Sequence, residues 1–159
     1  MKLTAKYELE APSAFVFDQL ADFDGWERAA MRHGADVMRT DSLAKIGAGA
    51  AWDAKFRYRG KMREVTIRLD ALQPKSAMGL TGISRLADAV MAIEVMDLGA
   101  THTRMQARLD ITPKTMAARI YVQSLRLARS RVERSFAQRI AQLAAEIENR
   151  YRTVKAAGR

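Results

Sequence analysis

The feature that most constrains the fold is a long stretch in which apolar and polar residues alternate with a period of two. From Asp36 to Asp110 no helical period is found, and alternating runs are separated by turn residues such as Gly60, Pro74 and Gly99. This pattern is typical of antiparallel strands joined by hairpins. It predicts six strands, at residues 35–40, 49–59, 62–72, 76–83, 87–97 and 101–111.

Other elements are expected on both sides of this region. Residues 2–10 alternate as well and predict a further strand. Residues 12–21 and 24–33 carry apolar side chains at helical spacing, which predicts two short helices. The longest periodic segment, 113–151, contains no Gly and, after its first residue, no Pro. It therefore predicts one uninterrupted helix with an apolar stripe.

The chain resembles a known superfamily in this order of elements and in its opening motif. The motif is Ala-Pro-Ser-Ala-Phe-Val-Phe-Asp-Gln-Leu-Ala-Asp-Phe at residues 11–23, followed by Trp26. It is similar to the start of START-like (SRPBCC) proteins, the polyketide cyclase/dehydrase and lipid transport group. The resemblance implies an α+β helix-grip fold, in which a seven-stranded curved antiparallel sheet wraps around a long C-terminal helix. We expect one domain over residues 1–152 and a flexible basic tail at 153–159.

The resemblance also implies an apolar cavity between the sheet and the long helix. We expect this cavity to bind a small hydrophobic molecule of the lipid, polyketide or isoprenoid type, with the protein acting as a carrier or sensor. Aromatic and thioether side chains adapt well to such ligands. The candidate ligand-binding residues are Trp26, Trp52, Phe56, Tyr58, Met78, Leu80, Met91, Ile93, Met105, Leu125 and Arg129.

Arg129 stands out among these candidates because its helical angle places it inside the apolar stripe of the long helix. A guanidinium facing an apolar cavity is costly unless it is paired, so Arg129 is interpreted as an anchor for a polar ligand group. The alternative is an ion pair with Glu133, four residues further on. A second hypothesis is a cyclase or dehydratase in which Glu94, aided by Arg129, transfers protons. We assign no catalytic residue.

The residue inventory argues against metal and cofactor chemistry. Cys is absent, and His33 and His102 have no partner at metal-ligand spacing. No glycine-rich phosphate loop is found either. We expect no cofactor and no metal.

Positive charge is concentrated at the end of the sequence. Residues 113–159 hold 11 Lys and Arg against 3 Asp and Glu, which accounts for most of the net charge of +9. A solvated helix face explains this pattern, and the alternative is transient contact with an anionic membrane surface or an acidic protein. A third functional hypothesis is an interaction module that docks an acidic partner through this Arg-rich C-terminal helix. Few aromatic residues and scattered arginines argue against nucleic acid. With no signal-peptide pattern and no apolar stretch near 20 residues, we expect a cytoplasmic protein.

Overall fold

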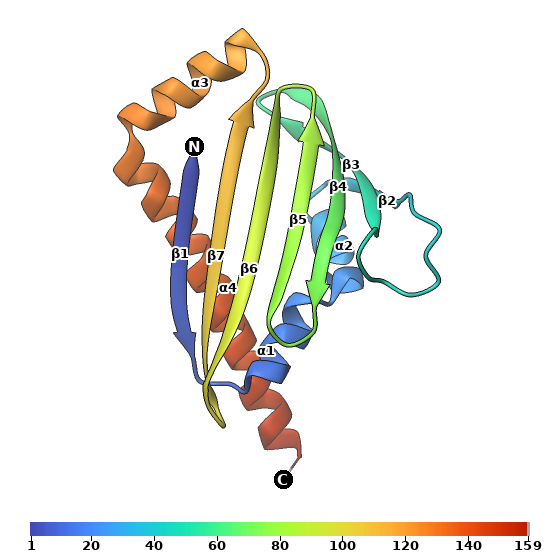
Figure 1. Ribbon diagram of the computed structural model, residues 1–159, viewed down its shortest axis with the longest axis vertical. Helices are drawn as coiled ribbons and strands as arrows, with labels where there is room; N and C mark the ends of the chain where they lie inside the picture. Colours follow the sequence, from blue (N-terminus) through green and yellow to red (C-terminus); the bar gives the residue numbers. More distant parts are fainter. Residues whose placement is uncertain (159) are drawn as a thin grey trace.

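The computed structural model describes residues 1–158, and the elements within this range follow the predicted order (Figure 1). The strands are β1 (Lys2–Leu9), β2 (Asp36–Arg39), β3 (Ala51–Tyr58), β4 (Lys61–Gln73), β5 (Ala77–Ser84), β6 (Ala87–Gly99) and β7 (His102–Pro113). The helices are α1 (Ser13–Leu20), α2 (Phe23–Arg32), α3 (Met116–Leu127) and α4 (Arg129–Ala157). Each predicted strand agrees with the observed one to within two residues at either end.

The strands described for residues 1–158 form a seven-stranded antiparallel sheet in the order β1-β7-β6-β5-β4-β3-β2. The register of β4 shifts between Leu69 and Ala71, and that of β6 shifts between Asp97 and Gly99. Irregularities of this kind bend a strand and increase its twist. Figure 1 shows the helices on one side of the sheet, with β2 and β3 curling toward them. The predicted curved sheet of a helix-grip fold is confirmed.

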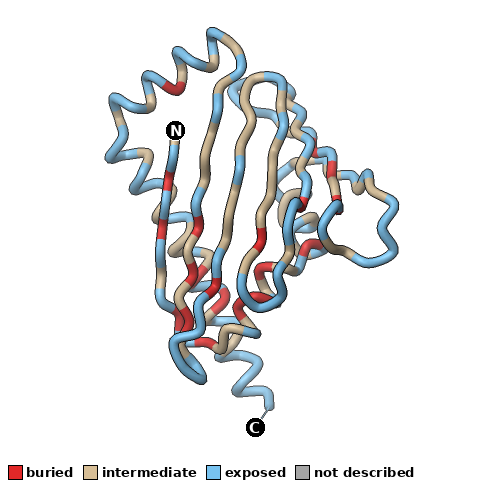
Figure 2. Tube along the Cα trace, in the orientation of Figure 1, coloured by how far each residue is buried: buried red, intermediate tan, exposed pale blue. Residues whose placement is uncertain are grey.

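The hydrophobic core lies where one face of the sheet meets α1, α2 and α4. Leu9, Leu20, Leu69, Met105 and Ile147 are almost fully buried there. Figure 2 shows that buried positions concentrate in the lower half of the view, whereas the strand ends nearest α3 are mostly half-buried or exposed. The helices therefore cover only part of the sheet.

Two hydrogen bonds tie the N-terminal part of the chain to elements that come later in the sequence. The hydroxyl of Tyr7 on β1 donates to the Ala137 carbonyl of α4 at 2.9 Å. The buried hydroxyl of Thr103 donates to the carbonyl of Ala11 at 2.7 Å. Because α4 also packs along β1, the edge strand of the sheet is covered on the side that faces the helices.

The prediction of one uninterrupted C-terminal helix was wrong. The helix breaks at Ala128, whose φ of −109° and ψ of 33° separate α3 from α4. The amide of Ala128 donates to the carbonyl of Leu125, three residues back, so the last turn of α3 is tightened. Ala has the highest helix propensity, so the local sequence does not explain the break. Contacts of α3 with β7 and with the β3–β4 hairpin override the local preference.

The end of α4 differs from the expected tail as well. The helix continues to Ala157, so residues 153–157 are helical. Arg159, the last residue of the expected tail, lies outside the described residues. Extension of α4 beyond Tyr151 follows from side-chain contacts within its last turns, where Arg152 donates to Asn149 at 2.8 Å and pairs with Glu148 at 3.3 Å.

Candidate functional site

A cavity of about 1210 Å³ lies over the part of the sheet that the helices leave uncovered. The side chains that face it come from alternate positions of β3 to β7, which the strand register brings onto one face. They are Ala54, Phe56, Tyr58, Arg63, Val65, Gly82, Ser84, Ala87, Ala89 and Ile111. The same face carries the core residues further along the strands. Core and cavity therefore form one continuous apolar surface.

The cavity is hollow because the sequence places small residues at its floor. Gly82 of β5 and Ala89 of β6 are direct cross-strand partners, and Ala89 in turn is opposite Ile111. On the neighbouring strands Ala54 is paired with Val65. Larger side chains at Gly82 and Ala89 would fill the space above the sheet.

Among the described residues of β3 and β4, Arg63 is the only charged residue that lines the cavity and also lies on the cavity side of the sheet. Its partner across the strands is Phe56, and Val65 follows it on the same face. The Nε atom of Arg63 is buried and has no hydrogen-bond partner among residues 1–158. A buried donor without an acceptor is unfavourable, and functional sites are a common reason for one.

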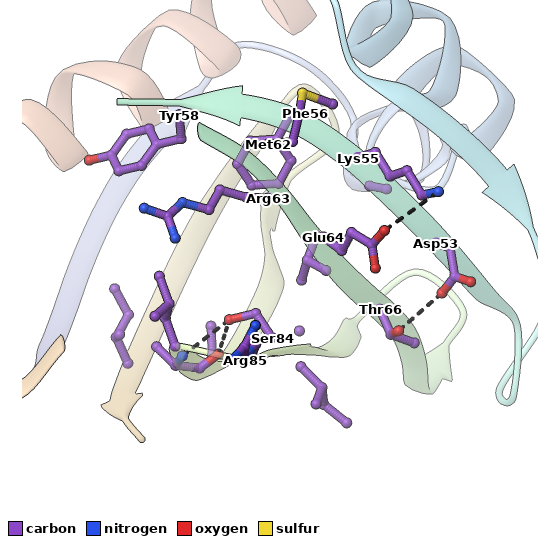
Figure 3. A pocket seen from close by; sticks show the side chains of 18 of the residues that line it. Asp53, Lys55, Phe56, Tyr58, Met62, Arg63, Glu64, Thr66, Ser84 and Arg85 are labelled. Atoms are coloured by element: carbon purple, nitrogen blue, oxygen red, sulfur yellow. Dashed lines mark hydrogen bonds and ion pairs between the residues drawn. The ribbon is translucent and has the colours of Figure 1, made fainter. Parts of the chain in front are cut away.

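The acidic residues near Arg63 are engaged elsewhere. Strand alternation directs Asp53, Lys55 and Glu64 to the opposite face, although they border the cavity. There Lys55 pairs with Glu64 at 3.5 Å, and Asp53 accepts a hydrogen bond from Thr66 at 3.0 Å. Figure 3 shows Tyr58 and Arg63 projecting to one side, away from these two pairs. The positive charge of Arg63 is thus left uncompensated inside the cavity.

Two tyrosines join α3 to the β3–β4 hairpin at the mouth of the cavity. The hydroxyls of Tyr58 and Tyr121 lie 3.1 Å apart, and Arg59 donates to Tyr121 at 3.0 Å. Arg59 also lies over the Tyr121 ring, 4.4 Å from its centroid. Either hydroxyl can donate in the bond between the two tyrosines, since Tyr121 can accept from Arg59 and still donate or accept a second bond. This bond lowers the pKa of Tyr58 below its ordinary value, with a smaller contribution from Arg59, and raises the pKa of Tyr121.

The sequence-predicted residues of the sheet divide between cavity and core. Phe56 and Tyr58 line the cavity. Three of the predicted residues are buried in the core beneath the helices: Trp52, Met78 and Met105. Leu80 and Ile93 are partly buried and pack against the core. Met91 is half-buried and pairs with Leu80 across the strands.

The three predicted residues on helices lie outside the cavity lining. Trp26 is 43% exposed on α2, and its indole donates to the Leu20 carbonyl at 2.9 Å. Leu125 is half-buried on α3. Arg129 begins α4, is 67% exposed and pairs with Glu133 at 2.7 Å, as the alternative interpretation expected. It does not face the cavity, because the break at Ala128 changes the direction of the helix.

Sequence reasoning missed Arg63 although the signal was present. Val65, Ile67 and Leu69 alternate with polar residues in the sequence, which favours an inward-facing side of this strand, and Arg63 has the same parity two positions earlier. Glu94, the acid of the enzyme hypothesis, lies on the outer face, where it is 53% exposed and 4.0 Å from Arg108.

Within residues 1–158, no cluster of three or more acidic or histidine side chains could hold a metal ion.

None of the helices described for residues 1–158 is long and apolar enough to cross a membrane.

Comparison with known proteins gives matches in structure only. No family model matches the chain, and no curated protein matches its sequence. The Zhui aromatase/cyclase from Streptomyces sp. R1128 superposes with a TM-score of 0.65 at 15% identity, covering 94% of both chains. Ara h 8.0201 gives a TM-score of 0.62 at 12% identity, covering 96% of this chain and 98% of its own.

A third solved structure carries the superfamily name. The START superfamily protein from Mycobacterium smegmatis gives a TM-score of 0.55 at 12% identity, covering 89% of this chain and 98% of its own. Identities this low establish the architecture and leave the activity open. The sheet order, the helices on its concave face and these superpositions agree that the chain has the helix-grip fold of the START-like (SRPBCC) superfamily.

Proposed function

We propose that the protein binds a small, largely apolar molecule with an anionic group at one end, as a carrier or sensor. The observation that carries this proposal is Arg63, a guanidinium with a buried, unpartnered Nε atom in a cavity otherwise lined mainly by small, aliphatic and aromatic side chains. An apolar body gains by leaving water, at roughly 25 cal/mol for each Å² buried. A carboxylate or phenolate would satisfy the Arg63 donors.

The cavity is large enough for a ligand of several rings or a long chain. Its volume of about 1210 Å³ exceeds the range of roughly 300–1,000 Å³ that is usual for small-molecule sites. Phe56 lies on the same face as Arg63 and offers an aromatic surface beside the proposed anion site. The ligand would therefore place its polar end at the β3–β4 hairpin and its apolar body over Gly82 and Ala89.

Binding is favoured over catalysis by the position of the acids. Proton transfer at a carbonyl needs a general acid or base within hydrogen-bonding distance of the ligand. Glu94 and Asp53 lie on the outer face of the sheet, and Arg129 lies outside the cavity. The proposed role therefore needs no reaction step.

Mass spectrometry tests the proposal directly. The gently purified protein is measured under native and then denaturing conditions, and we expect a stoichiometric small acidic molecule to be released on denaturation. A second test uses two matched dyes, the anionic 8-anilinonaphthalene-1-sulfonate and its neutral analogue N-phenyl-1-naphthylamine. Both should bind one to one, since both present the same apolar rings.

The Arg63→Met variant separates the two dyes. A hydrogen bond to a charged group contributes about 1.5–3 kcal/mol, so the variant should bind the anionic dye roughly 10–150-fold more weakly and the neutral dye unchanged. Arg129→Met removes an exposed arginine outside the cavity and should change neither affinity. If neither dye binds stoichiometrically, or if both variants behave alike, the proposed function is wrong.

A further inference from the structure

The outer face of α3 carries an apolar stripe that no other part of the described chain covers. Met116, Ile120 and Leu127 are 68%, 64% and 92% exposed. Their spacing of four and seven residues places them on one side of the helix. The opposite side carries Val122, which is buried. Figure 1 shows α3 at the margin of the molecule, beyond the edge of the sheet.

Positive charge accompanies this stripe. Arg119 and Arg126 are exposed and lie seven residues apart, so they flank it on the same side. No Asp or Glu occurs between Asp110 and Glu133. An apolar stripe bordered by arginines and free of acids is the composition of helices that lie in the plane of an anionic membrane surface.

A basic groove lies beside the start of α4, next to this helix. It has a volume of about 570 Å³ and is lined by Lys2, Arg129 and Arg134 with a single acid, Glu133. Arg129 is bound to Glu133 at 2.7 Å, which leaves an excess of positive charge in the groove. Basic residues near a membrane surface attract anionic lipids.

We propose that α3 docks the protein on an anionic phospholipid surface. A second copy of the chain fits the stripe less well, because a twofold contact would bring Arg119 and Arg126 against the same arginines of the partner with no acid on α3 to balance them. Docking through the stripe would leave the contacts of Tyr121 with the β3–β4 hairpin intact, since Tyr121 lies on a different side of this helix.

Vesicle sedimentation tests this surface. The wild type should bind vesicles of phosphatidylcholine with phosphatidylserine and should bind pure phosphatidylcholine vesicles weakly, with a partition that falls as salt is raised. The variant with Met116→Ser, Ile120→Ser and Leu127→Ser should lose binding to the mixed vesicles by roughly tenfold for each side chain. These residues are exposed, so the fold should be unaffected.

A matched control uses exposed apolar residues elsewhere. Val90→Ser with Met96→Ser changes two side chains that are 53% and 55% exposed on the outer face of β6, and it should leave the partition unchanged. Arg119→Gln with Arg126→Gln should weaken binding to the mixed vesicles and reduce its salt dependence. Leu127→Trp should show a blue-shifted fluorescence only when phosphatidylserine is present.

Three results would overturn the proposal. They are equal binding to both vesicle types, unchanged binding by the triple serine variant, and a dimer of the wild type that the triple serine variant loses. The last result would assign the stripe to a second copy of the chain. Binding of the naphthalene dyes, measured on the same variants, should be unaffected, so failure of membrane docking can be told apart from failure of the proposed ligand site.

Discussion

Replacing Arg63 by Met should stabilise the protein without ligand while weakening its binding of anions. The Nε donor of Arg63 is buried without a partner, and one such group costs about 1–3 kcal/mol. Met keeps the apolar part of the side chain and removes the donor. Because the Arg63 side chain as a whole is half-buried, we expect a value near the lower end of this range, a gain of about 1–1.5 kcal/mol in the free energy of unfolding.

This gain is measurable as a change in melting temperature. Each kcal/mol shifts the Tm of a domain of this size by about 2–4 °C, so ligand-free Arg63→Met should melt roughly 2–6 °C above the wild type. Differential scanning calorimetry after removal of any bound ligand by refolding gives the value. Arg57→Met, on the exposed outer face of the same hairpin, is the control and should change stability by less than about 0.5 kcal/mol.

The result that would refute the reasoning is a lower Tm for ligand-free Arg63→Met. It would mean that the guanidinium is satisfied by water and stabilises the fold, in which case Arg63 is a structural residue. A higher Tm combined with weaker binding of the anionic dye would show that stability has been sacrificed at this position for ligand recognition.

Three further predictions concern acid stability, the core and the cavity mouth. The Arg39 guanidinium, and after it the Ala51 amide, hold the pKa of Asp41 well below its usual range. The stability that Asp41 contributes is therefore present above about pH 4 and is lost as the pH falls through the pKa of the folded state. In thermal melts at acid pH, the stability advantage of the wild type over Asp41→Asn should shrink. Ile147→Ala should cost about 2–5 kcal/mol in urea unfolding because Ile147 is fully buried, whereas a change at the 58% exposed Val154 of the same helix should cost little. Tyr121→Phe should speed release of the anionic dye in stopped-flow measurements and cost less than about 1 kcal/mol of stability.

The fold was predictable because strand alternation survives in the sequence wherever one face of a sheet is buried. Trp52, Ala54 and Phe56 alternate with charged residues in β3, and the observed register places them on the face that meets the helices. Turn residues marked the hairpins at Gly60 and Gly99, both of which adopt positive φ values. Local signals of this kind do not depend on how the helices pack.

The division of that face into core and cavity was not predictable from alternation. Trp52 and Phe56 have the same parity on the same strand, yet Trp52 packs on Phe23 of α2, with ring centroids 5.5 Å apart, and Phe56 lines the cavity. Only the position of the helices distinguishes them. Arg129 was assigned to the site because, in one continuous helix, it would lie on the same side as the apolar residues before Ala128. The helix breaks at Ala128, so residues before and after it no longer share one side.

The position of α3 follows from a balance of small interactions, and this bears on both proposals. A continuous helix through Ala128 would gain backbone hydrogen bonds but would lose the Tyr121 contacts with the hairpin and the burial of Val122. Single hydrogen bonds of this kind contribute only about 0.5–1.5 kcal/mol each. Since the same helix contacts the hairpin beside the cavity and exposes the apolar stripe, a membrane surface that binds the stripe changes the balance that holds α3 in place. Docking and ligand exchange are therefore expected to be coupled through α3, and the Tyr121 contact is where that coupling should be sought.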